Sequence, residues 1–118
     1  MATHNFREMV IWKDSIKIAK DIYAISSEFP IHEKYGISSQ LQRAAVSISA
    51  NIAEGSDRAS DVDFKRFLSF SVGSAYELEL LLTIAKEVGY LEEKCYSDII
   101  QELQYLQKMM HKFSQQLQ

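Results

Sequence analysis

The three histidines are the residues most suited to metal chemistry in this chain: His4, His32 and His111. A carboxylate-bridged metal centre in a helical bundle uses Glu-x-x-His pairs on facing helices. None of these histidines has a glutamate three positions upstream. His32 lies in a predicted connection and His111 on the polar side of the last predicted helix, where solvent-facing side chains are expected. We therefore predict no metal site and no cofactor.

Nucleophilic and acid–base chemistry has equally few candidates. Cys95 stands near the start of a predicted helix, a position that can lower a thiol pKa. Its place on the apolar side of that helix favours a small core residue instead. Glu77 and Glu79 are two positions apart and so face different sides of a helix. No glycine-rich phosphate loop and no Ser/His/Asp or Cys/His set is found. The sequence predicts that the protein is not an enzyme.

Composition limits the class of protein further. The chain has 118 residues, a net charge of −3 and a single cysteine, so we expect one domain in a reducing cytoplasm, without an internal disulfide. No segment resembles a secretory signal or approaches the roughly 20 apolar residues of a membrane span. The acidic balance gives no overall attraction to nucleic acid or to an anionic membrane.

Apolar periodicity and turn residues predict an all-α protein, an antiparallel up-down-up-down four-helix bundle spanning 1–118. The expected helices are 10–27, 38–54, 60–88 and 92–117. Pro30 interrupts the chain after the first helix, because proline lacks an N–H. Ser39 with Gln42, and Ser60 with Asp63, are spaced as capping boxes at the starts of the second and third helices. Gly55 and Gly89 are expected to end these two helices as C-cap residues.

The second predicted helix is unusually poor in charge. Arg43 is the single charged residue between Tyr35 and Glu54, whereas a surface helix normally has a charged, solvated face. The third helix carries two apolar stripes, of which an isolated bundle needs only one. The first contains Phe64, Leu68, Ser71, Ala75, Leu78, Leu82 and Ala85, and the second Phe70, Ser74, Glu77, Leu81, Ile84 and Val88. These patterns predict a homo-oligomer.

Polar residues on these two helices form the first candidate site. A buried arginine needs a charged or hydrogen-bonding partner. An antiparallel helix pair that turns at 55–60 places Arg43 roughly level with residues 72–74, from where its long side chain could reach Glu77. We therefore predict a buried Arg43–Glu77 ion pair within a polar network, inside or between subunits. The residues assigned to this network and oligomer interface are Gln40, Arg43, Ser47, Asn51, Glu54, Ser74 and Glu77.

Basic residues form a second candidate site, for contact with nucleic acid. The residues are Lys13, Lys17 and Lys20 on the first helix, joined by Arg7, and Arg58, Lys65 and Arg66 around the start of the third. Repeated around an oligomer, such clusters would form a positive band, and phosphate contacts dominate nucleic-acid affinity. The alternative is an ordinary solvated face, in which Asp14 and Asp21 pair with Lys17 at helical spacing. No RNA- or DNA-reading motif is present.

The chain resembles the 23S ribosomal RNA intervening-sequence proteins, a family of four-helix bundles. The resemblance rests on QLQRAAVSI at 40–48 and NIAEG at 51–55. Further matching positions are Trp12, Phe29-Pro30, Glu33-Lys34-Tyr35-Gly36, Gly73-Ser74, Glu77-Leu78-Glu79 and Gly89-Tyr90-Leu91. The resemblance implies a bacterial homopentamer. A related branch, the accessory proteins of diversity-generating retroelements, binds a reverse transcriptase and nucleic acid.

These observations lead to two functional hypotheses. The first is a non-enzymatic, homo-oligomeric helical bundle that acts as a binding or scaffolding module, pentameric if the resemblance holds. The alternative is an accessory protein that binds RNA, DNA or a reverse transcriptase. Salt-sensitive binding of nucleic acid would distinguish the second hypothesis from the first.

Overall fold

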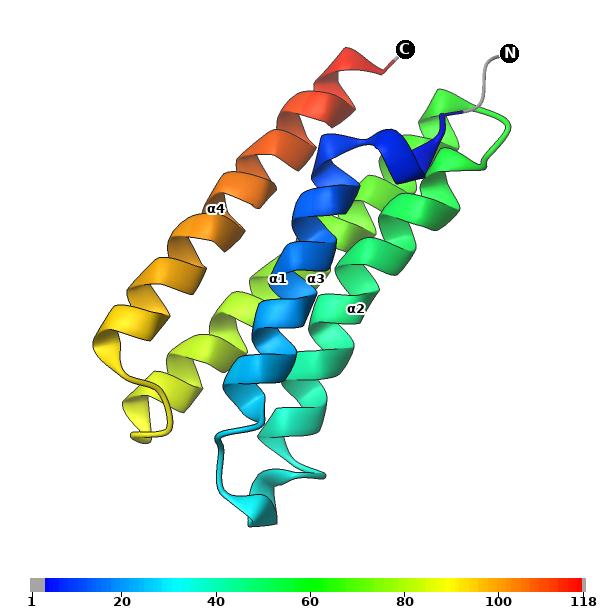
Figure 1. The fold of residues 1–118 in the computed structure, drawn as a ribbon. Helices are drawn as coiled ribbons and strands as arrows, with labels where there is room; N and C mark the ends of the chain where they lie inside the picture. Colours follow the sequence, from blue (N-terminus) through cyan, green and yellow to red (C-terminus); the bar gives the residue numbers. More distant parts are fainter. Residues whose placement is uncertain (1–3, 118) are drawn as a thin grey trace.

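A computed structural model describes residues 4–117, which form four α-helices and two short 3-10 turns and contain no strand. The α-helices are α1 (Val10–Ser26), α2 (Ile37–Ser56), α3 (Asp61–Glu87) and α4 (Glu93–Gln116), and the turns are η1 (Phe6–Glu8) and η2 (Ile31–Glu33). Each helix packs on the next along the chain, and α4 packs back on α1. The helices alternate in direction, so both described ends lie at one end of the bundle (Figure 1). The predicted all-α four-helix bundle is confirmed, and the helix ends lie within two residues of those expected.

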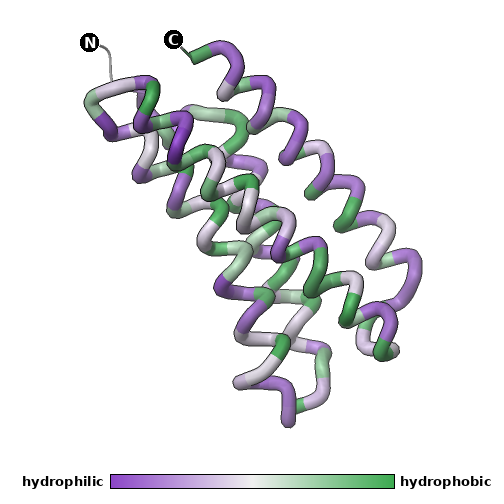
Figure 2. Tube along the Cα trace, turned by 180° about the vertical axis from the view of Figure 1, so that it is seen from behind, coloured by the Kyte–Doolittle hydropathy of each residue, from purple (hydrophilic) through white to green (hydrophobic). Residues whose placement is uncertain are grey.

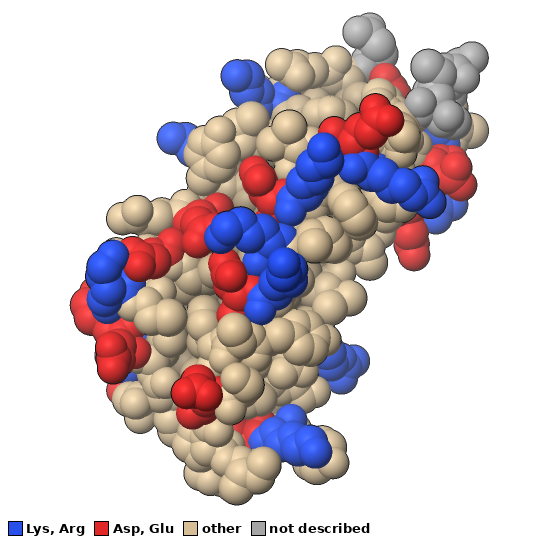
Figure 3. Space-filling view, viewed as in Figure 1, with Lys and Arg blue, Asp and Glu red and all other residues tan. Residues whose placement is uncertain are grey.

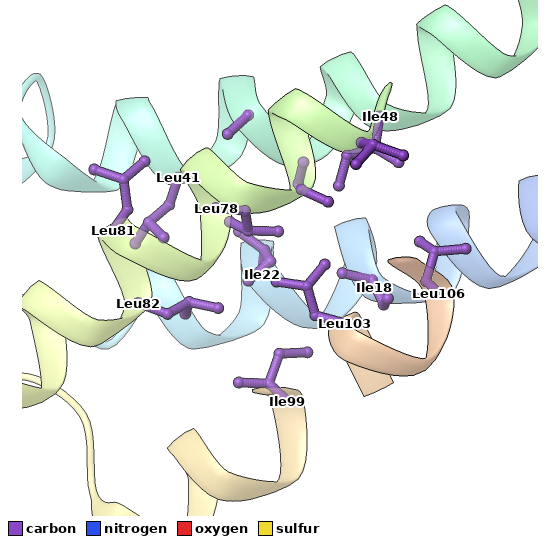
Figure 4. Packing of buried hydrophobic residues seen from close by; sticks show 14 of the residues in the cluster. Ile18, Ile22, Leu41, Ile48, Leu78, Leu81, Leu82, Ile99, Leu103 and Leu106 are labelled. Atoms are coloured by element: carbon purple, nitrogen blue, oxygen red, sulfur yellow. The ribbon is translucent and has the colours of Figure 1, made fainter. Parts of the chain in front are cut away.

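One apolar stripe from each helix forms the core. In α3 the whole first predicted stripe is buried, from Phe64 to Ala85. In α4 the buried residues Ile99, Leu103, Leu106 and Met110 repeat at alternating spacings of four and three, as antiparallel packing requires. Figure 4 shows labelled core side chains converging from all four helices. Green and purple segments alternate along the helices in Figure 2, as expected when each helix turns one apolar stripe inward.

Two of the four predicted helix boundaries are confirmed in detail. The Ser60 side chain accepts a hydrogen bond from the Asp63 N–H at 3.2 Å and caps α3. Gly89 follows the end of α3 with φ of +89°, in the left-handed region that glycine enters without strain. At the start of α2 the prediction is wrong, because Ser39 lies inside the helix and the N-cap is Gly36. There Glu33 accepts a hydrogen bond from the Ile37 N–H at 3.4 Å and takes the role of the cap.

Gly55 is not the C-cap that the sequence predicted. Gly89 is the one residue with positive φ among residues 4–117, and Gly55 is a buried residue within α2. A Cβ on Gly55 would lie 2.7 Å from Phe67 Cβ and 2.8 Å from Phe64 Cδ1. Gly55 is therefore required by the close approach of α2 to α3, and the helix continues to Ser56.

α3 is also long and apolar enough to cross a membrane, judged by length and composition alone. Its most apolar stretch of 18 residues is 44% buried inside the bundle. The core helix of a soluble protein meets the same criteria, because a helix that contacts several neighbours is apolar over much of its circumference. In this fold α3 contacts both α2 and α4, and that packing accounts for the buried part of this stretch.

Candidate interaction surface

Three residues of the predicted polar network meet between α2 and α3. Ser47 Oγ and Ser74 Oγ are 2.9 Å apart and share a hydrogen bond. Asn51 Nδ2 donates to the Ser47 carbonyl at 2.9 Å and to Ser47 Oγ at 3.1 Å. All three side chains are half-buried. The structure therefore brings Ser47, Asn51 and Ser74 together within one chain.

The predicted buried Arg43–Glu77 ion pair is not formed within one chain. Both residues are exposed, and no ion pair joins them among residues 4–117. Gln40 and Glu54 are also exposed, and Glu54 lies 3.8 Å from Arg58. The physical reason is that these four residues lie on the outer stripe of the two helices, and no other helix of the chain covers that stripe.

Apolar side chains surround Arg43 and Glu77 on this surface. Val46 on α2 is 47% exposed, and Phe70 and Ile84 on α3 are 46% and 42% exposed. Val88 continues the line of exposed apolar residues toward the end of α3. We call this surface the outer face of α2–α3, formed by Gln40, Arg43, Val46, Ala50, Phe70, Glu77 and Ile84. It contains half of the second stripe predicted for α3, namely Phe70, Glu77 and Ile84, whereas Leu81 of that stripe is buried.

A groove between α3 and α4 adjoins this face and was not predicted from the sequence. It encloses about 920 Å³. Its lining residues are Tyr76, Glu79, Leu80, Thr83, Gln101, Gln104, Tyr105, Gln107, Lys108 and His111. Tyr76, Leu80 and Tyr105 are each more than half exposed. One sequence pattern could have indicated this groove. Tyr76 and Leu80 form an apolar pair at i,i+4 spacing on α3, outside both of its predicted stripes.

Glu79 is the central charged residue of the groove. Its carboxylate accepts hydrogen bonds from Gln107 Nε2 at 3.1 Å and from Gln104 Nε2 at 3.4 Å. Within residues 4–117 no charged nitrogen of a lysine, arginine or histidine lies within 4.0 Å of a Glu79 carboxylate oxygen. Two neutral amides therefore hold a carboxylate in place while its charge stays unpaired.

The basic residues assigned to nucleic-acid contact differ in their surroundings. Lys17 Nζ lies 2.7 Å from Glu102 and 3.1 Å from Asp21, and these hydrogen bonds raise the pKa of Lys17 to about 12. The expected pairing of Lys17 with Asp21 is thereby confirmed. Lys13 and Lys20 on the same helix are exposed. Acidic and basic side chains lie next to one another on the face seen in Figure 3, so this face has no continuous positive patch.

The second basic cluster lies against aromatic rings. The Arg58 guanidinium stands 4.4 Å from the centre of the Phe67 ring, and the Arg66 guanidinium 5.1 Å from the same centre. Each arginine also faces an acid, Arg58 with Glu54 at 3.8 Å and Arg66 with Asp63 at 3.5 Å. Lys65 is half-buried beside them. These contacts hold the two guanidiniums against the protein surface.

Cys95 has the character of a packing residue rather than a nucleophile. It is partly buried and packs against the core. Burial, and then the neighbouring carboxylate of Asp98, raise the pKa of its thiol, whereas a reactive cysteine has a lowered pKa. His32 and His111 are exposed, as expected from the sequence. Among residues 4–117 no three His, Cys, Asp or Glu side chains are grouped as metal ligands.

Fold and surface together define a small all-α four-helix bundle whose most distinctive feature is an uncovered apolar face. The chain belongs to the family of 23S rRNA-intervening sequence proteins, whose model matches residues 7–112. A similar solved structure is a protein of unknown function from the S23 ribosomal protein family of Bacteroides thetaiotaomicron VPI-5482. The two chains are 25% identical, with a TM-score of 0.81 over 89% of this chain and 98% of the other. No curated protein matches the chain.

Proposed function

We propose that this protein is a non-enzymatic helical module that associates with copies of itself and acts as a scaffold for binding. The observation that carries the proposal is the outer face of α2–α3. Val46, Phe70 and Ile84 are each between 42% and 47% exposed there, and Arg43 and Glu77 are the charges among them. Monomeric soluble proteins rarely expose large contiguous apolar patches, and such patches commonly mark interaction sites.

A second copy of the chain is the simplest partner for this face. Homo-oligomers are the most common assemblies of soluble proteins, and the family resemblance implies five subunits. Covering Val46, Phe70 and Ile84 would remove apolar surface from water, which stabilises an assembly by about 25 cal/mol per Å² before the costs of association. The assembled module would then present the polar face of α1 to further partners.

Light scattering coupled to size-exclusion chromatography tests the proposal. The wild-type chain is expected to elute as one species with a mass several times that of the 13.6 kDa chain. Phe70→Glu is expected to reduce the mass to that of a monomer, because the new charge would be buried in the interface. Tyr23→Glu is the matched control, since Tyr23 on α1 is 50% exposed, close to the 46% of Phe70. A wild-type chain that elutes as a monomer at high concentration would contradict self-association.

A second candidate function is the binding of nucleic acid, directly or in a complex with a reverse transcriptase. The observation in its favour is that Lys13 and Lys20 on α1 are exposed and make no ion pair within residues 4–117. Lys17, between them in sequence, is already paired with two acids. The available positive charge per subunit is small, so binding would depend on the repetition of these lysines around an assembly.

Fluorescence anisotropy of a labelled structured RNA, measured at several salt concentrations, tests this second function. Binding through phosphates would weaken steeply with salt and would be lost in the Lys13→Glu/Lys20→Glu variant. Lys34→Glu is the control, because Lys34 is exposed beside η2 and is not part of α1. The absence of binding at low salt would contradict direct recognition of RNA.

A further inference from the structure

We propose that the outer face of α2–α3 of one copy docks into the α3–α4 groove of the next copy, with Arg43 of the first paired to Glu79 of the second. This inference rests on the self-association proposed above and specifies which surfaces meet. A contact between two different surfaces is heterologous, and it repeats until it closes into a ring or continues as a filament.

The first surface, the outer face of α2–α3, is the ridge of this contact. On α2 it combines two short side chains, Val46 and Ala50, with the longer Gln40 and Arg43. Gly73 on α3 contributes no side chain, and a Cβ placed on it would meet nothing within 4 Å. Small residues allow the backbone of α2 to approach a partner closely. Arg43 is the charged side chain that α2 contributes to this face.

The second surface is concave and amphipathic. The α3–α4 groove encloses about 920 Å³, and Tyr76, Leu80 and Tyr105 line it with more than half of each side chain exposed. Tyr76 Oη and His111 Nε2, 3.4 Å apart, link α3 to α4 beside it. A groove between two antiparallel helices suits a third helix, whose apolar side chains would contact the tyrosine rings while its polar ones reach the glutamines.

Unpaired charges on the two surfaces indicate that they contact each other. Arg43 makes no ion pair within residues 4–117, and Glu79 has no cation within 4.0 Å in the same range. Glu79 is half-buried, and its two glutamine donors orient the carboxylate at 3.1 and 3.4 Å. A guanidinium is well suited to such an acceptor, because it can donate two parallel hydrogen bonds to a carboxylate. Each surface also carries one charge of the opposite sign, Glu77 on the outer face and Lys108 in the groove, so a contact that joins Arg43 to Glu79 would bring together surfaces of mixed and complementary charge.

A self-complementary contact of the outer face is the main alternative. In a two-fold contact the outer face would meet another outer face, and the groove would stay empty. A substitution can disrupt one surface without changing the other, because Val46 belongs to α2 and Tyr105 to α4. Both side chains are substantially exposed, at 47% and 57%, so replacing either with glutamate leaves the core intact.

The experiment mixes two variants, Val46→Glu with a damaged ridge and Tyr105→Glu with a damaged groove. Sedimentation velocity measures the mass of the wild type, of each variant alone and of the equimolar mixture, and circular dichroism checks that the helices are retained. A heterologous contact predicts that each variant alone is a monomer. The mixture is expected to form a one-to-one dimer and nothing larger, because it contains one intact ridge–groove pair.

The outcomes separate this inference from the proposed function. A Tyr105→Glu variant that assembles as the wild type does would overturn the groove as the docking site. A mixture that stays monomeric well above the concentration needed for wild-type assembly would also overturn it. In both cases an oligomeric wild type would still support the proposed self-association. A monomeric wild type would contradict self-association itself.

Discussion

Gly55 of α2 lies so close to Phe67 of α3 that a Cβ on the glycine would stand 2.7 Å from Phe67 Cβ. The two helices are therefore in near-backbone contact at this level. A second close contact follows farther along the pair, where Ser71 Oγ donates a hydrogen bond to the Ile48 carbonyl at 2.8 Å. Close packing of α2 on α3 makes these two helices one continuous surface, and the outer face is the exposed side of that surface.

Replacing Gly55 with alanine is expected to destabilise the fold. The added methyl group overpacks the interface, which costs about 1–3 kcal/mol, and the helix propensity of alanine offsets about 1 kcal/mol of that. Chemical denaturation of Gly55→Ala should show the net loss. Gly73→Ala is the matched control, because a Cβ there meets nothing within 4 Å. Both substitutions are measured in the Phe70→Glu background, so that folding is separated from assembly. There Gly73→Ala should leave the free energy of unfolding unchanged or increase it. Equal effects at both glycines would contradict the close approach.

A hydrogen bond from Tyr90 to Glu33 ties the α3–α4 turn to the connection before α2, at 2.9 Å. This bond, and then the bond from the Ile37 N–H, lower the pKa of Glu33 below its ordinary value of 4.5. A carboxyl group with a lowered pKa contributes stability that is present above its unfolded pKa and lost as the pH falls through the folded value. We expect Glu33→Gln to reduce the loss of stability below pH 4.5.

Tyr90→Phe provides the control for this pH dependence. It removes the same hydrogen bond while Glu33 stays ionisable, so the acid-induced loss of stability should also become smaller. At the other end of the pH range, the bond to Glu33 raises the pKa of Tyr90. Stability from the neutral phenol is present below pH 10.0 and is lost as the pH rises through the higher folded value. Denaturation curves of the three proteins across pH that superimpose would contradict the link.

The thiol of Cys95 is expected to react slowly. Burial and the carboxylate of Asp98 raise its pKa, so the thiolate is scarce at neutral pH, and the thiolate is the form that reacts. Alkylation by iodoacetamide should be slower in the folded protein than in the urea-unfolded chain at the same pH. A folded protein that reacts as fast as the unfolded chain would show that folding neither shields the thiol nor raises its pKa, which would contradict this account.

Charge reversal distinguishes the proposed partner of Arg43 from the one predicted on the sequence. Arg43→Glu is expected to weaken assembly, because it places a second carboxylate beside Glu79 of the neighbouring copy. Adding Glu79→Lys to the same chain should restore assembly, whereas adding Glu77→Lys should not. Sedimentation of the three variants measures this. Rescue by Glu77→Lys, and not by Glu79→Lys, would support a pair between Arg43 and Glu77 instead.

The fold and the buried stripe of α3 could be predicted from the sequence because both depend on local periodicity and turn residues. Ser47, Asn51 and Ser74 could also be grouped, because Ser47 and Asn51 share one face of α2 at i,i+4 spacing and the antiparallel α3 runs beside that face. The exposure of Arg43 could not be foreseen, because a low charge density predicts that a helix is covered and does not indicate by what. Gly55 was misassigned for a related reason: a glycine at a helix end and a glycine at a close contact look alike in a sequence. The α3–α4 groove arises from the angle between two helices, which periodicity does not encode.

Self-association through the outer face of α2–α3 is the central claim, and sedimentation equilibrium of the wild-type chain tests it most directly. The account predicts a mass that is a multiple of 13.6 kDa across a range of concentrations, and a return to the monomer mass in Phe70→Glu. A wild-type mass of one chain at every concentration would contradict the claim. So would an assembly that Phe70→Glu leaves unchanged.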